Sequence, residues 1–65
     1  MRRAAIEEII GIFMRRDGMS RKEAIERLKE AYSAVQEAIF NEYDADEVWM
    51  EETGLEPDYL YDLIF

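Results

Sequence analysis

Residues 20–40 carry the pattern that most constrains the fold of this chain. Apolar side chains recur there with a strict 3-4-3-4 spacing, which places them along one face of an α-helix. Ser20 and Glu23 precede the run in the arrangement of a capping box, in which each side chain satisfies a free backbone N–H of the other residue. The spacing predicts a long helix that ends near residues 40–41. Its apolar stripe consists of Ile25, Leu28, Tyr32, Val35 and Ile39.

Three alanines line one edge of that stripe. Ala24, Ala31 and Ala38 repeat every seven residues, and small residues on a helix face let a neighbouring helix approach closely. We expect this seam to support self-association into a homodimer. A chain of 65 residues gives a reason for it, because below roughly 70–80 residues a single core supplies only about 3–5 kcal/mol. Arg27 and Lys29 are expected on the outer face of the helix as solvated charge.

Two more helices are predicted on either side of the long one. Residues 3–16 place apolar side chains at helical spacing, and Gly18 is a good residue to end this helix. Residues 44–53 begin with Asp44, a favoured N-cap residue, and stop at Gly54.

A short last helix completes the predicted fold. Glu56 is placed as its N-cap and Pro57 at its first position, where proline is favoured, while Leu55 and Leu60 occupy the two positions of a hydrophobic staple. No stretch alternates in the manner of a strand. The sequence therefore predicts an all-α fold, a small bundle of three to four helices with a long central helix, in a single domain over residues 1–65.

Side chains that carry catalysis or bind metals are scarce. The chain has no cysteine and no histidine, so the usual nucleophiles, general bases and zinc ligands are missing. No glycine-rich phosphate loop is present. We therefore expect a protein that is not an enzyme, with no cofactor and no metal site. No apolar run approaches the roughly 18 residues of a membrane span, and we expect a cytoplasmic protein.

Charge is distributed unevenly along the chain. All eight Lys and Arg residues lie in residues 1–30, where six acids leave a formal charge of +2. Residues 31–65 contain ten acids and no base, for a formal charge of −10. Such a block disfavours direct binding to nucleic acid, which requires clustered Lys and Arg. It attracts basic surfaces and speeds the encounter with them, although acids also serve solubility and helix capping.

Aromatic residues interleaved with these acids supply candidate contact residues. Tyr43 and Tyr61 fall off the apolar stripes and are expected to be exposed, whereas Trp49 and Tyr59 are in helical phase with the core. Exposed tyrosines suit interfaces because they combine a large area with a polar handle. The predicted partner-binding residues are Glu42, Tyr43, Asp44, Asp46, Glu47, Glu51, Glu52 and Tyr61.

Two short motifs carry a resemblance to known proteins. They are the run Gly54-Leu55-Glu56-Pro57-Asp58-Tyr59-Leu60 and the helix start Ser20-x-x-Glu23-Ala24. With them, roughly the last 45 residues resemble short acidic helical proteins found in phages and mobile elements of bacteria. The resemblance implies a bacterial host and carries over no functional residues. By analogy, small acidic phage proteins include inhibitors of host defence, such as anti-CRISPR and anti-restriction proteins, several of which resemble nucleic acid in charge.

These features favour a phage-type inhibitor that binds a host protein. Its acidic face is expected to dock on a basic, nucleic-acid-handling host protein in the bacterial cytoplasm. Two alternatives stay open: a self-associating structural or assembly module that pairs through the alanine seam, and an antitoxin-like partner of a basic toxin. The leading hypothesis requires that the carboxylates gather on one part of the fold without pairing with the arginines of the first helix.

Overall fold

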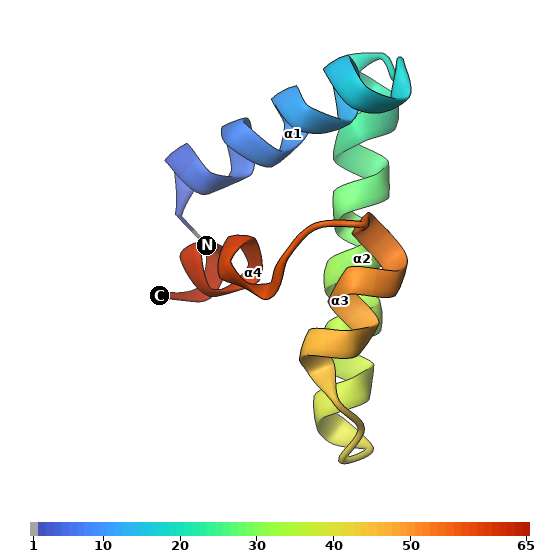
Figure 1. Cartoon of the computed structure of the whole chain (residues 1–65), viewed down its shortest axis with the longest axis vertical. Helices are drawn as coiled ribbons and strands as arrows, with labels where there is room; N and C mark the ends of the chain where they lie inside the picture. Colours follow the sequence, from blue (N-terminus) through green and yellow to red (C-terminus); the bar gives the residue numbers. More distant parts are fainter. Residues whose placement is uncertain (1) are drawn as a thin grey trace.

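The computed structural model describes residues 2–65, which form four helices and no strand (Figure 1). In chain order the helices are α1 (Arg3–Asp17), α2 (Arg21–Phe40), α3 (Ala45–Thr53) and α4 (Pro57–Ile64). α2 is the longest, with 20 residues, and it runs along the long axis of the molecule (Figure 1). The prediction of an all-α fold around a long helix is confirmed.

Side chains at the helix ends explain where the helices begin and stop. The Ser20 hydroxyl accepts a hydrogen bond from the N–H of Glu23 at 3.2 Å, and the N–H of Ser20 donates to the Glu23 carboxylate at 2.9 Å. The predicted capping box is therefore present. Gly18 and Gly54 end α1 and α3 in the left-handed region, with φ of 66° and 70°, a conformation that a side chain would strain.

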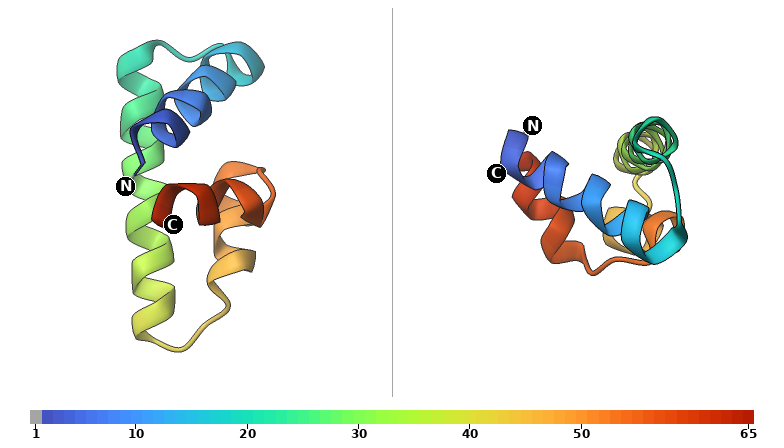
Figure 2. Two further views of the ribbon diagram at one scale, coloured as in Figure 1. Left: turned by 90° about the vertical axis from the view of Figure 1, so that its left-hand side faces the viewer. Right: turned by 90° about the horizontal axis from the view of Figure 1, so that it is seen from above.

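The other three helices pack on one side of α2. α1 crosses the N-terminal part of α2, α3 runs back along its C-terminal half, and α4 lies against α1 and α3 (Figures 1 and 2). The beginning and the end of the described chain meet, because the N–H of Arg2 donates to the carbonyl of Leu63 at 3.1 Å. This contact and the packing of α4 close the bundle.

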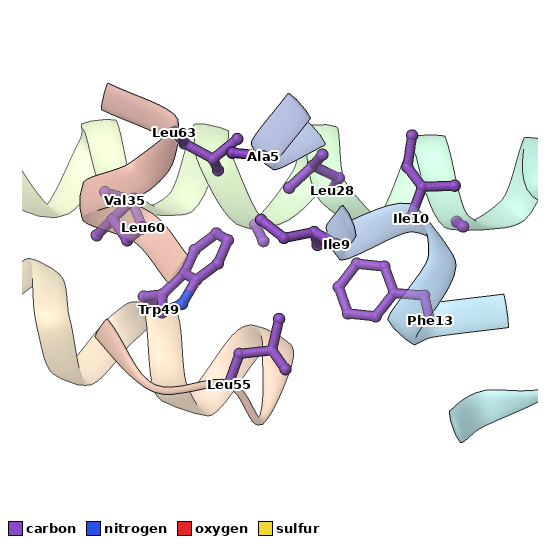
Figure 3. Close-up of a cluster of buried hydrophobic side chains, with 12 residues drawn as sticks. Ala5, Ile9, Ile10, Phe13, Leu28, Val35, Trp49, Leu55, Leu60 and Leu63 are labelled. Carbon is purple, nitrogen blue, oxygen red and sulfur yellow. The ribbon is translucent and has the colours of Figure 1, made fainter. Parts of the chain in front are cut away.

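The hydrophobic core is centred on the indole of Trp49. This side chain and that of Phe13 have no exposed surface. Figure 3 shows Trp49 surrounded by Ile9 from α1, Val35 from α2 and Leu60 from α4. The prediction that Trp49 belongs to the core is confirmed.

The buried face of α2 is rotated relative to the stripe that apolar spacing predicts. It consists of Ala24, Leu28, Ala31, Val35 and Ala38. Ile25 and Tyr32 are only half-buried, and Ile39 is 58% exposed. The small alanines face inwards because the bulky Trp49 and Phe13 of the neighbouring helices need the space beside α2, and a core is packed without large voids.

This rotation corrects the expected role of the alanine seam. Ala24 and Ala31 have no exposed surface and Ala38 is 3% exposed, all within a single chain. A second copy cannot reach them unless the core opens. The alanines do allow a close approach of helices, but the helices that pack against α2 are α1 and α3 of the same chain.

Candidate interaction surface

α3 carries most of the predicted partner-binding acids, and its first turn is capped by one of them. The Asp44 carboxylate accepts hydrogen bonds from the N–H groups of Asp46 and Glu47 at 3.0 and 3.4 Å. These bonds satisfy N–H groups that have no partner inside the helix. Negative charge in the first turn also matches the positive end of the helix dipole. Three acids are thereby fixed at one end of α3.

Two arginines from other helices hold the opposite end of α3. Arg16 donates to the carbonyl of Thr53 at 2.7 Å, and Arg27 donates to the carbonyl of Glu52. Cations at this position stabilise the negative end of the helix dipole. Arg27 is half-buried, so its expected place as solvated charge on the outer face of α2 is wrong. The acceptor lies 25 residues along the chain, and no local pattern indicates it.

A buried hydrogen-bond network joins α3 to α4. The Trp49 indole N–H donates to the carbonyl of Glu56 at 3.1 Å. The Thr53 hydroxyl donates to the carbonyl of Trp49 at 2.7 Å and accepts from the N–H of Leu55 at 3.1 Å. The sequence does not predict this role of Thr53, because both partners of its hydroxyl are backbone groups. The network fixes the angle between the two helices, so the surface that they share is formed in advance.

Tyr61 and Asp46 connect the outer faces of α4 and α3. The Tyr61 hydroxyl donates to the Asp46 carboxylate, 15 residues earlier in the chain. This hydrogen bond raises the pKa of the Tyr61 phenol, with further contributions from desolvation and from the negative charges of Asp46, Asp44 and Asp58. The hydrogen bond and desolvation are the main causes of the shift, and the nearby negative charges add to it.

The eight predicted partner-binding residues lie on the α2–α3 turn, on α3 and on α4. Tyr43 is 71% and Tyr61 42% exposed, so both are accessible as predicted. Of the acids, Glu42, Asp44, Glu47 and Glu51 are exposed, and Asp46 and Glu52 are half-buried. We call this set of eight residues the α3 surface.

No cation of residues 2–65 forms an ion pair with the acids of this surface. Two ion pairs form within residues 2–65, Arg16 with Asp17 and Arg21 with Glu7, each at 2.7 Å. Each pair lowers the pKa of its carboxyl group, chiefly through the hydrogen bond from the arginine. In this described range, none of the ten acids after residue 30 has a cation within ion-pair distance. Of the α1 arginines, Arg16 pairs with Asp17 and also reaches the carbonyl of Thr53 at the end of α3, but it forms no ion pair with a carboxylate of the α3 surface.

The C-terminal end of α2 also exposes large apolar side chains beside these acids. Phe40 is 87% and Ile39 58% exposed. The α2–α3 turn is ordered by the helix end, where the N–H of Tyr43 donates to the carbonyl of Ala38 at 2.8 Å. The sequence prediction did not single out Phe40, and it placed Ile39 on the apolar face of the helix.

Residues 2–65 contain neither a cluster of candidate metal ligands nor a helix that could span a membrane. No cluster of three or more Asp and Glu side chains in this range is placed to hold a metal ion. Within the same range, every helix is too short or too polar to cross a bilayer. Neither a family profile nor a curated protein nor a solved structure matches the chain.

Proposed function

We propose that this protein is a phage-type inhibitor that uses the α3 surface to bind a basic, nucleic-acid-handling protein of its bacterial host. In this proposal its carboxylates take the place of nucleic-acid phosphates, as in anti-CRISPR and other anti-defence proteins that resemble nucleic acid in charge. The observation that supports it most is the set of acids on α3 and its flanks that lack a cation within ion-pair distance in residues 2–65.

The electrostatics favour attraction of a basic partner. The chain has a net charge of −8, and its cations all lie before residue 30. A field of one sign speeds association with a surface of the opposite sign by roughly 10–10³. Binding that depends on it weakens as salt is added, because salt screens exposed charges.

The proposed contact is centred on the first turn of α3, because the two exposed tyrosines lie beside it. Tyr43 directly precedes the N-cap residue Asp44, and the Tyr61 hydroxyl donates a hydrogen bond to Asp46. Exposed aromatic rings that are surrounded by polar groups commonly supply much of the binding energy of an interface. The hydrogen bond holds the Tyr61 ring in one orientation, which reduces the entropy lost on binding.

Charge reversal on this surface tests the proposal. Immobilised protein is incubated with a bacterial lysate at low salt, and retained proteins are identified and then eluted with salt. We expect a basic, nucleic-acid-binding protein in the eluate. A triple variant, Glu42→Lys, Glu47→Lys and Glu51→Lys, is expected to lose this protein, because it reverses three exposed charges of the α3 surface.

A matched variant separates the surface from the overall charge. Glu8→Lys, Glu26→Lys and Glu30→Lys reverse three exposed acids on α1 and α2, so the change in net charge is the same. This variant is expected to retain the captured protein. Equal binding by both triple variants would contradict the proposed role of the α3 surface.

A further inference from the structure

α2 presents an apolar stripe that the chain itself covers only in part. Ile25, Tyr32 and Ile39 are spaced seven residues apart, so they share one side of the helix. Two of them are half-buried and Ile39 is 58% exposed. Seen from above, α2 stands at the edge of the molecule with the other helices to one side (Figure 2). We call these three residues the α2 stripe.

At its N-terminal end the α2 stripe joins an apolar groove between α1 and α2. The groove has a volume of about 250 Å³ and is lined by Ile6, Glu7, Ile10, Arg21, Ile25, Leu28 and Lys29. Pockets that enclose small molecules usually measure about 300–1,000 Å³. The groove is smaller and only partly enclosed, and its size suits apolar side chains of a protein.

The two ends of α2 carry opposite charges. Residues 21–30 hold four bases and three acids, a net charge of +1, whereas residues 31–42 hold two acids, Glu37 and Glu42, and no base. Two α2 helices in antiparallel orientation bring each basic end to the acidic end of the other helix. A parallel pair brings like charges together, which is unfavourable.

We propose that the α2 stripe is a homodimer interface in which two α2 helices pack antiparallel around a twofold axis at Tyr32. Ile25 and Ile39 lie at equal distances in sequence on either side of Tyr32. Ile25 of one copy can therefore meet Ile39 of the other. The exposed Ile39 and Phe40 of one copy then reach the groove of the other, and Lys22 of one copy faces Glu42 of the other.

A second copy fits these features because the stripe is complementary to itself. A twofold interface uses the same patch on both subunits. Here one patch contains the groove at the N-terminal end of α2 and the exposed Ile39 and Phe40 at its C-terminal end. Burial of the stripe also adds apolar contacts to a chain of 65 residues, whose single core is small. The α2 stripe and the groove contain no residue of α3 or α4, and the proposed dimer does not depend on the proposed function.

Sedimentation of the wild-type protein and of two charge variants tests the interface. We expect a dimer for the wild type. Ile39→Glu places a charge in the interface and is expected to weaken the dimer by about tenfold or more, with helicity retained because Ile39 is exposed in the single chain. Met50→Glu is the matched control, since Met50 is 45% exposed on α3, and it is expected to remain dimeric.

Single cysteines test the orientation, because the chain contains none. On mild oxidation Tyr32→Cys is expected to form a covalent dimer, since a disulfide requires Cα atoms within about 7 Å. Glu30→Cys, exposed on α2, is expected to stay monomeric under the same conditions. A mixture of Ile25→Cys and Ile39→Cys is expected to form mainly the mixed disulfide.

Three results would overturn the proposal. The first is a wild-type protein that sediments as a monomer at every concentration. The second is equal cross-linking of the Glu30→Cys and Tyr32→Cys variants. The third is a disulfide that forms mainly between two Ile25→Cys chains. Loss of the dimer by Ile39→Glu without loss of the captured host protein would show that the dimer and the α3 surface act separately.

Discussion

Replacing Ala31 with glutamate tests the finding that the alanine seam belongs to the core. Ala31 has no exposed surface. Thr53 is the only buried polar or charged residue in residues 2–65, so no buried cation can pair with a new carboxylate. The introduced carboxyl group avoids a buried charge by binding a proton. With an unfolded-state pKa of about 4.3, protonation at pH 7 costs about 3.7 kcal/mol, at 1.36 kcal/mol per pH unit. Shifts of this size are known for buried glutamates.

That cost is large relative to the stability of such a chain. At roughly 0.05–0.15 kcal/mol per residue, a domain of this length is stable by about 3–10 kcal/mol. Overpacking of the site by the longer side chain adds about 1–3 kcal/mol. We therefore expect Ala31→Glu to lose much of its helicity at neutral pH, which far-UV circular dichroism measures.

Ala31→Gln is the matched control, because it has nearly the same shape and does not titrate. The introduced carboxyl has a folded-state pKa above its unfolded value, so the free energy of unfolding of Ala31→Glu falls as the pH rises between these two values. The difference in the free energy of unfolding between Ala31→Gln and Ala31→Glu should grow by about 1.4 kcal/mol per pH unit above pH 4.3 and vanish below it. Urea unfolding at several pH values measures this difference. A Glu variant as stable as the Gln variant at pH 7 would refute the burial of Ala31 in a single chain.

Three further predictions concern α3 and its contacts. Thr53→Val leaves the buried N–H of Leu55 without an acceptor and should lower the free energy of unfolding by about 1–3 kcal/mol, as measured with urea, while Thr53→Ser should retain the hydrogen bonds. Gly54→Ala forces a side chain into the left-handed region at φ 70° and should cost about 1–2 kcal/mol in the same assay. Tyr61→Phe removes the phenol whose pKa is raised, chiefly by the hydrogen bond to Asp46, so an alkaline-shifted component should disappear from a spectrophotometric tyrosine titration; an unchanged titration curve would contradict the Tyr61–Asp46 contact.

The sequence predicts the helices well because their determinants are local. The capping box at Ser20, the N-cap Asp44 and the left-handed Gly54 each act within one turn of the chain, and each is recognisable from residue type and spacing alone. The exposure of Tyr43 is equally predictable, since it falls outside the apolar periodicity.

What the sequence does not predict is which side of α2 faces inwards. Periodicity gives an arc that contains both Ala31 and Tyr32, and it favours the larger apolar residues as core. The choice depends on the volume of side chains from distant segments, above all Trp49, which is fully buried in the same core cluster as Ala24 and Ala31. The sequence also does not predict the hydrogen-bond acceptor of Arg27, because this acceptor is a backbone carbonyl that only the fold brings close.

The way in which α3 is held has a consequence for how such a protein can change over generations. Its last turn is fastened by guanidinium groups that bind main-chain carbonyls of Glu52 and Thr53, and every residue type offers the same carbonyl. The outward positions Glu47 and Glu51 take no part in this attachment. Their side chains can therefore be replaced while the helix keeps its place, so that the proposed partner-binding face can vary without loss of the scaffold that presents it.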